Sequence, residues 1–257
     1  MALDLLTLPC LSDNYAFLIH NPDTLETALI DVPEAAPIVA ALAEKGWTLT
    51  DILLTHHHWD HIDGLADLLA ALPHKPRIWG AAADAHRLPP LDHALTPADT
   101  PQICGETVQI LDMPGHTVGH IAYHFPQSRL LFSGDSLMVM GCGRLFEGTP
   151  AQMWASLQQT NPLPGETLIC SGHEYTASNI RFALSLEPAN QQLILRDNRV
   201  TAQRAAGKPP VPATLAHERQ TNPFLRAHSP DLKAALGMPR AADVETFTEI
   251  RARKDKF

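Results

Sequence analysis

The densest group of residues that could bind a metal lies in residues 55–61, which read THHHWDH after the apolar run DILLT. In an extended loop, side chains two positions apart share one side, so His56, His58 and Asp60 are expected to converge. His61 would join them at the following turn. A tetrahedral metal that also binds a water has room for three protein ligands. Four ligand-type residues in a single loop therefore favour two metals. A surface histidine run of the expression-tag kind is disfavoured. The segment lies inside the chain, and it contains an aspartate at the same two-residue spacing as the histidines.

Three further apolar runs each end in a glycine turn followed by one more potential ligand. QILDMPGH, RLLFSGD and TLICSGH supply His116, Asp135 and His173. Loops at strand ends are where a rigid sheet places functional groups, and glycine permits the tight turn. Taken alone, each residue has an ordinary interpretation as a turn or packing residue, but their conjunction favours a metal site. Five histidines and two carboxylates suit two divalent ions, zinc first, with iron or manganese as alternatives.

The other histidines lack ligand-type partners at metal spacing and are interpreted as surface or packing residues: His20, His74, His86, His93, His120, His124, His217 and His228.

The elements that must position these ligands are short apolar strands. They are expected at 16–20, 27–32, 51–55, 77–80, 106–113, 120–125, 129–135 and 167–172. Helical spacing predicts one helix over 34–46, ending at Gly46, and another over 64–72, with Asp63 as its N-cap. Strands with interspersed helices favour an α/β sandwich over residues 1–174. Helical segments at 177–187, 190–207, 213–220 and 242–254 then predict a small helical domain over residues 175–257.

Composition restricts the classes of partner. The chain has 257 residues, 45% of them hydrophobic, a formal net charge of -9 and four scattered cysteines. The negative charge disfavours nucleic acid, and no apolar run reaches the ~20 residues of a membrane span. Four cysteines without CxxC spacing favour a reducing compartment, and we expect a cytoplasmic monomer with no membrane or nucleic-acid partner. Cys142 and Cys170 are interpreted as packing residues, with chemical modification of Cys142 as the alternative.

The pattern HxHxDH, followed by separate His, Asp and His residues, resembles the metallo-β-lactamase superfamily. That resemblance implies an αββα sandwich, followed here by the small α-helical C-terminal domain. It also implies that His56, His58 and His116 bind one metal, that Asp60, His61 and His173 bind the other, and that Asp135 bridges them. Asp60 and Asp135 would be the catalytic residues, acting with a metal-bound hydroxide.

Four further segments resemble glyoxalase II (hydroxyacylglutathione hydrolase), so that the resemblance covers nearly the whole chain: CGRLFEGT (142–149), GHEYT (172–176), TNPFLR (221–226) and RARKD (251–255). It implies hydrolysis of S-(2-hydroxyacyl)glutathione thioesters such as S-D-lactoylglutathione to glutathione and D-lactate, the second step of methylglyoxal detoxification. The substrate-binding residues it implies are Arg144, Tyr175, Arg251 and Lys254.

Two residues of the 142–149 segment depart from the family pattern. Arg144 stands where lysine is common, and Phe146 stands where tyrosine is often found. Arginine keeps the charge but not the geometry of lysine, and phenylalanine lacks the hydroxyl donor, so substrate affinity is the property expected to change. Plainer interpretations make the basic tail a solvated helix end and Tyr175 a packing residue.

Other activities of the same fold remain open at this point. They are another thioesterase, a persulfide dioxygenase, a β-lactamase, a nucleic-acid phosphodiesterase and a noncatalytic metal-binding protein. The complete second ligand set and the helical tail favour hydrolysis over the dioxygenase. A β-lactamase would normally be exported, and the net charge disfavours the phosphodiesterase.

Overall fold

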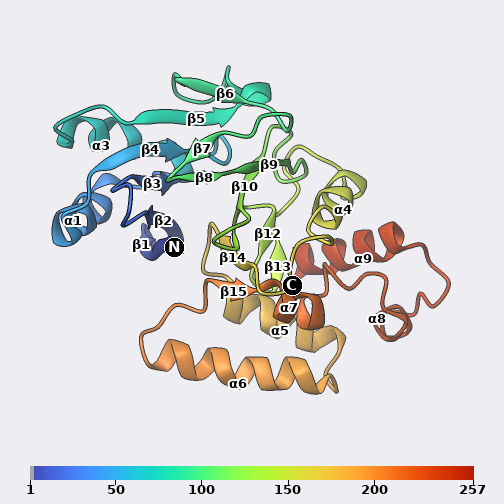
Figure 1. Ribbon diagram of the computed structural model, residues 1–257. Coiled ribbons are helices and arrows are strands. Elements are labelled where there is room, and N and C mark those ends of the chain that lie inside the picture. The colour runs from blue at the N-terminus through green and yellow to red at the C-terminus, as the bar shows by residue number, and fades with distance from the viewer. Residues whose placement is uncertain (1–2) are drawn as a thin grey trace. The chain divides into compact units, whose positions relative to one another are not determined.

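The computed structural model describes residues 3–257, and its chain divides into two compact units (Figure 1). The first unit comprises Met1–Asp112 and Gly119–Gly134, and the second comprises Met113–Val118 and Asp135–Phe257. Each unit carries part of the expected ligand set.

The first unit contains a six-stranded mixed sheet of order β1-β2-β3-β4-β5-β6. Strands β1 to β3 pair antiparallel, whereas β3 to β6 pair parallel. The strands are β1 (Asp4–Cys10), β2 (Asn14–His20), β3 (Thr27–Ile30), β4 (Leu49–Leu53), β5 (Arg77–Ala81) and β6 (His93–Leu95).

One face of this sheet packs against a second layer of strands within the same unit. Strands β9 (Gln109–Asp112), β10 (Ile121–Phe125) and β11 (Leu130–Gly134) pair antiparallel, and β7 (Gln102–Ile103) pairs with β8 (Glu106–Thr107). The Tyr123 hydroxyl donates to the Leu54 carbonyl at 2.8 Å, and the rings of Phe17 and Phe132 lie 5.6 Å apart. The two layers therefore share a buried aromatic interior.

Helices cover the six-stranded sheet. Helices α1 (Ala35–Lys45) and α3 (Leu65–Ala71) bury Ile38 and Leu68 in one cluster with the strand residues Leu18, Leu29 and Ile52. A one-turn helix, α2 (Trp59–Ile62), precedes α3, and a 3-10 turn, η1 (Ala82–Asp84), follows β5. Apolar faces buried between helix and sheet give the α/β sandwich that the sequence predicted.

The structure corrects two local predictions. Asp63 is not the N-cap of α3, because it ends α2 and the N-cap position of α3 is Gly64. The single strand expected over 106–113 is broken between β8 and β9 at Val108, whose buried backbone N–H bonds to Pro101 instead of a partner strand. The end of α1 at Gly46 is confirmed.

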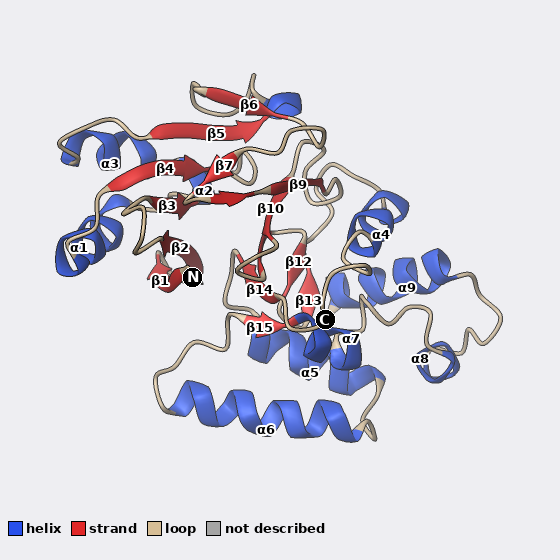
Figure 2. Ribbon diagram, in the orientation of Figure 1, coloured by secondary structure: helices blue, strands red, loops and turns tan. Residues whose placement is uncertain are grey.

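The second unit is mostly helical after β14 (Figure 2). Its core includes the rings of Phe182, Phe224 and Phe247, with neighbouring centroids 6.1 and 5.8 Å apart. Its strands are β12 (Leu137–Met138), β13 (Gly141–Cys142), β14 (Leu168–Ser171) and β15 (Ala213–Thr214). Its helices are α4 (Pro150–Gln158), α5 (Thr176–Leu186), α6 (Gln191–Ala205), α7 (Leu215–Thr221), α8 (Pro230–Ala235) and α9 (Asp243–Lys256).

The four helical segments predicted after residue 174 correspond to α5, α6, α7 and α9. The boundary expected between residues 174 and 175 divides a catalytic domain from a substrate-binding domain. This division stays a prediction. Among the described residues, no helix combines the length and the apolar character that crossing a membrane requires.

We predict that Gly46→Ala destabilises the protein by about 1 kcal/mol without changing its chemistry. Gly46 has a φ of 66° at the end of α1, and a Cβ there would meet nothing within 4 Å, so only backbone strain is at issue. Thermal unfolding followed by circular dichroism measures the loss. Gly46→Asn, which tolerates the left-handed conformation better, should lose less, and equal stability of all three proteins would refute this account of the helix end.

Candidate metal centre

The first unit gathers four of the predicted ligands just beyond β4. The ring of His56 lies 4.7 Å from that of His58 and 4.2 Å from that of His61, measured between centroids. Asp60 Oδ2 is 3.9 Å from His61 Nε2. The four side chains therefore form one cluster.

The backbone of this cluster turns earlier than we expected, because its extended part ends at His58 and the turn already includes Asp60. Asp60 and His61 belong to the helical turn α2, which the His61 N–H helps to form by donating to the His58 carbonyl at 2.9 Å. Adjacent residues of an extended chain point to opposite sides, whereas a helical turn keeps them closer in direction. The turn thus lets Asp60 and His61 serve one cluster. Trp59 is 65% exposed, and the His57 ring is hydrogen-bonded to Asp84, so neither side chain joins the cluster.

Asp31 is a buried carboxylate of this cluster that the sequence analysis missed. Its Oδ2 accepts a hydrogen bond from the Thr55 hydroxyl at 2.8 Å and lies 2.8 Å from His61 Nδ1, while its Oδ1 accepts from the Thr55 N–H. One potential ligand atom each from Asp31, His56 and His61 lies within 4.8 Å of the others. Because Asp31 engages Nδ1 of His61, the opposite ring nitrogen is presented to Asp60. A carboxylate behind a ligand histidine fixes its tautomer and orientation.

Asn14 is the second residue that the sequence analysis missed. This buried side chain at the start of β2 donates from Nδ2 to the Asp60 carbonyl at 2.9 Å and to Asp60 Oδ2 at 3.1 Å. Both missed residues had a weak signal, since Asp31 is a charged residue within the apolar run TALIDV and Asn14 lies two residues before the predicted strand over 16–20.

The second unit gathers the other three predicted ligands. Asp135 Oδ2 lies 3.4 Å from His116 Nε2 and 3.3 Å from His173 Nε2, and all three residues are buried. Nδ1 of His116 donates to the carbonyl of Arg144 at 2.8 Å, so Nε2 is the nitrogen presented to Asp135. His116 is thus held through Nδ1 as His61 is, but its partner is a backbone carbonyl and not a carboxylate.

Two of the expected glycine turns have the backbone that they were predicted to need. Gly115 (φ 151°) precedes His116, and Gly134 (φ 47°) precedes Asp135. Side chains at both positions would also collide with neighbours, the first with Met153 and the second with Thr55. Glycine is therefore required at both ligand-bearing turns.

The predicted substrate-binding residues all lie in the second unit, where Asp255 links two of them. Arg251 Nη2 lies 2.8 Å from Asp255 Oδ1, and Arg144 Nε lies 3.8 Å from the same oxygen. Arg251 is only 6% exposed and donates to the Cys142 carbonyl at 3.0 Å, whereas the Arg144 side chain is 62% exposed. The alternative interpretation of the tail as a solvated helix end therefore fails for Arg251, although it describes the exposed Arg253.

Lys254 is half-buried on α9. Its Nζ lies 3.5 Å from the Ser178 hydroxyl and 5.3 Å from the ring centroids of both Phe182 and Phe257. Burial, followed by repulsion from Arg251 and a second nearby arginine, lowers the pKa of Lys254. A partly buried ammonium group beside other positive charges favours binding of an anionic group.

Aromatic rings lie beside two of the predicted ligand histidines. Tyr175, 39% exposed, stacks on His173 with centroids 4.9 Å apart and planes 4° apart. Phe146, 61% exposed, lies 5.3 Å from the His116 ring, and the Arg144 guanidinium carbon is 6.0 Å from its centroid. Phe146 thus offers Arg144 a ring face in place of a hydroxyl.

The donor atoms of both units suit a borderline divalent cation. They are imidazole nitrogens and carboxylate oxygens, and the hydrogen bonds to Nδ1 of His61 and His116 turn Nε2 of each ring toward the cluster. The His/Asp clusters are consistent with a dinuclear metal site.

Comparison with known proteins agrees with the fold and with the family resemblance. Residues 15–173 match the model of the metallo-beta-lactamase superfamily, and residues 174–257 match that of the hydroxyacylglutathione hydrolase C-terminus. A hydroxyacylglutathione hydrolase of Jannaschia sp. (strain CCS1) is 62% identical over 98% of both chains, and that of Fuscovulum blasticum is 61% identical over 100% of both. A protein solved in a di-iron-bound form is similar with a TM-score of 0.58 and 26% identity, covering 86% of this chain and 100% of the other.

The fold and the matched segment place this chain in the metallo-β-lactamase superfamily. Within that superfamily, the full-length relatives show that it belongs to the hydroxyacylglutathione hydrolase family, also called glyoxalase II.

We predict that Asp31→Asn lowers the affinity for divalent metal by about 10- to 100-fold, because Asn cannot hold the Nδ1–H of His61 as a carboxylate does. Competition with a chromogenic chelator measures the affinity. Asp51→Asn is the matched control: Asp51 is equally buried in the same unit but serves Trp79 and Arg77. Equal metal affinity of Asp31→Asn and the unmutated protein would show that the carboxylate does not orient the ligand.

We also predict that none of the four cysteines reacts with a thiol reagent at pH 8 in the folded protein. Burial raises the pKa of Cys142 to about 11 and that of Cys10 to about 12, and it raises those of Cys104 and Cys170 further. The thiolate is the reactive form, so each thiol reacts very slowly at pH 8 and faster at more alkaline pH or after unfolding. Titration with Ellman's reagent before and after denaturation tests this. Rapid labelling of Cys142 in the native protein would instead support its modification.

Proposed function

We propose that this chain hydrolyses S-(2-hydroxyacyl)glutathione thioesters such as S-D-lactoylglutathione to glutathione and the 2-hydroxy acid, the second step of methylglyoxal detoxification. The support is twofold. Relatives named for this activity align over the whole chain, and the family's C-terminal model covers the helical segment. The expected division into a catalytic domain over 1–174 and a glutathione-binding domain over 175–257 forms part of this proposal.

The proposed ligands are the seven residues that the sequence singled out. His56, His58 and His116 would hold one metal, and Asp60, His61 and His173 would hold the other. The observation that carries the assignment is the position of Asp135, whose Oδ2 lies at nearly equal distances from His116 and His173. These two histidines belong to different ligand triplets, so a carboxylate between them is suited to bridge two ions.

Two bound divalent ions would supply a water of lowered pKa and would polarise the thioester carbonyl. Zinc suits the imidazole-rich set best, and iron stays an alternative because the similar protein noted above was solved with two irons. The chain's own contribution is orientation, since Asp31 fixes the His61 ring and Asn14 fixes the Asp60 carboxylate. A thiolate is a good leaving group, so no dedicated general acid is required.

The substrate's glutathione moiety would be held by Arg144, Tyr175, Arg251 and Lys254. Charged donors at fixed positions orient a flexible anionic carrier so that its thioester carbonyl is presented to the reacting groups. Lys254 is suited to this role because its ammonium group is already partly desolvated between two aromatic rings. Besides its substrate contact, Arg251 would hold the Cys142 carbonyl, two residues before Arg144.

We further propose that the protein acts as a cytoplasmic monomer. The four cysteines are free and buried, as suits a reducing compartment. Light scattering at assay concentration would test the monomer.

The activity is tested by steady-state hydrolysis of S-D-lactoylglutathione with purified, metal-analysed protein. A β-lactam and a phosphodiester serve as comparison substrates, and a chelator-treated sample serves as the control. We expect chelator-sensitive turnover of the thioester and background rates for the others. Two bound metals without thioester turnover would leave the fold intact and reject the substrate.

We predict that Lys254→Ala raises KM for the thioester by about tenfold, the loss of one charge-assisted contact, with little change in kcat and in metal content. Lys256→Ala is the matched control, since Lys256 is an exposed lysine on the same helix. Equal KM values for the two variants would remove Lys254 from the substrate site.

A further inference from the structure

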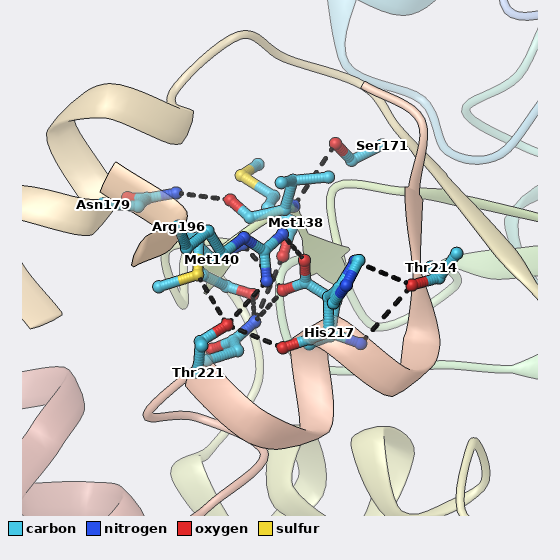
Figure 3. A network of polar contacts seen from close by, with 12 residues as sticks. Met138, Met140, Ser171, Asn179, Arg196, Thr214, His217 and Thr221 are labelled. Carbon is cyan, nitrogen blue, oxygen red and sulfur yellow. Dashed lines mark hydrogen bonds and ion pairs between the residues drawn. The ribbon is translucent and has the colours of Figure 1, made fainter. Parts of the chain in front are cut away.

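The two-residue turn between β12 and β13 is enclosed by buried polar side chains from elsewhere in the second unit (Figure 3). Met138 pairs with Gly141, leaving Val139 and Met140 as the turn. Met140 has a φ of 63°, in the left-handed region that residues other than glycine adopt at a cost. The sequence of this turn therefore does not favour its backbone, and surrounding groups must hold it.

Glu218 of α7 supplies the strongest of these contacts. Its carboxylate is fully buried, accepts the Met140 N–H at 2.7 Å, and forms an ion pair with Arg196 of α6. A charged acceptor bonded to a backbone N–H makes a stronger hydrogen bond than a neutral one. Arg196 neutralises the charge and so lets the carboxylate remain buried.

Two asparagines satisfy the carbonyl groups of the same turn. Asn222 Nδ2 donates to the Met138 carbonyl at 3.2 Å, to the Gly141 carbonyl at 3.0 Å and to Glu218 at 3.0 Å. Asn179 Nδ2, from α5, donates to the Val139 carbonyl at 3.2 Å. The polar backbone atoms of the turn thus depend on side chains rather than on a regular hairpin ladder.

The turn lies between two proposed functional residues. Asp135 precedes β12, and Arg144 follows β13 by two residues. The Arg144 carbonyl accepts the hydrogen bond that fixes His116, and a Cβ at Gly143 would collide with the Asp135 carbonyl oxygen. A displaced turn would therefore shift a substrate contact and the orientation of a ligand histidine together.

We propose that Glu218 and Asn222 are positioning residues for the reaction, which act by holding the β12–β13 turn and through it Arg144 and His116. This inference rests on the proposed function of Arg144 and His116. Neither Glu218 nor Asn222 would touch the substrate or the metals. Asn222 lies in the TNPFLR segment, so the inference gives part of that motif a physical role.

The test compares Glu218→Gln with Glu187→Gln in the full-length, metal-loaded protein. Glu187 forms a similarly buried ion pair with Arg226 in the same unit, without a hydrogen bond to the turn. The two variants thus lose comparable ion pairs, and only Glu218→Gln also weakens the hydrogen bond to the turn, because a neutral amide oxygen replaces the charged acceptor of the Met140 N–H. Melting temperature, metal content, kcat and KM for S-D-lactoylglutathione, and calorimetric binding of S-methylglutathione are measured for each.

We expect Glu218→Gln to lower kcat/KM by about tenfold to a hundredfold, mainly through KM, and to weaken S-methylglutathione binding by a similar factor. Glu187→Gln should lose thermal stability but keep its kinetic constants. Asn179→Ala removes one hydrogen bond to the turn and spares the ion pair. It should lower kcat/KM by a smaller factor, and it still tests the proposal if Glu218→Gln does not fold.

Unchanged kcat/KM in Glu218→Gln and Asn179→Ala, or equal losses in Glu187→Gln, would overturn the positioning role. An unmutated protein without thioester turnover would instead reject the proposed function. Binding of S-methylglutathione would still report on Arg144 in that case, so the two failures are distinguishable.

Discussion

An imidazole that binds a metal through Nε2 needs a group behind Nδ1, because the ring is otherwise free in both tautomer and rotation. Two buried contacts in this structure meet that requirement. The Asp31 carboxylate stands behind His61, and the Arg144 carbonyl stands behind His116. Both partners come from chain segments remote in sequence from the histidine they hold, so the ligand geometry depends on the complete fold of each unit.

Burying these groups carries an energetic cost that the fold offsets locally. A buried carboxylate without partners would be protonated or would destabilise the protein. Asp31 instead accepts hydrogen bonds from both the N–H and the hydroxyl of Thr55 in addition to its contact with His61. The aromatic and aliphatic layers around it exclude water, which strengthens each of these interactions. The left-handed φ of 57° at Asp31 is then tolerated because three contacts fix that residue.

The sequence predicted most of the strands, the α/β class and the helical C-terminal part, because apolar periodicity and glycine positions are local signals. It also singled out seven potential ligands, and the structure brings them together as one cluster in each unit. It did not predict α2, since four residues are too few to show periodicity and the segment also fits an extended loop. Asp31 and Asn14 were missed because their roles depend on which strands become neighbours. Single polar residues at strand ends do not carry that information.

The family resemblance added what the residues alone could not show, namely the substrate and the sharing of Asp135. The structure adds the physical basis for two of these assignments: Asp135 lies between histidines of different proposed triplets, and Lys254 is partly desolvated among aromatic rings. Helix α5 bonds to Lys254 of α9 through Ser178, α7 bonds to the β12–β13 turn through Glu218, and α9 bonds to the Cys142 carbonyl through Arg251. The helical part therefore contributes to the order of the proposed site.

Anomalous X-ray diffraction from crystals of the metal-loaded protein would show whether one carboxylate binds two metals. We expect two anomalous peaks, one bound by His56, His58 and His116 and the other by Asp60, His61 and His173, with Asp135 bound to both. A single peak, or two peaks that do not share Asp135, would contradict it.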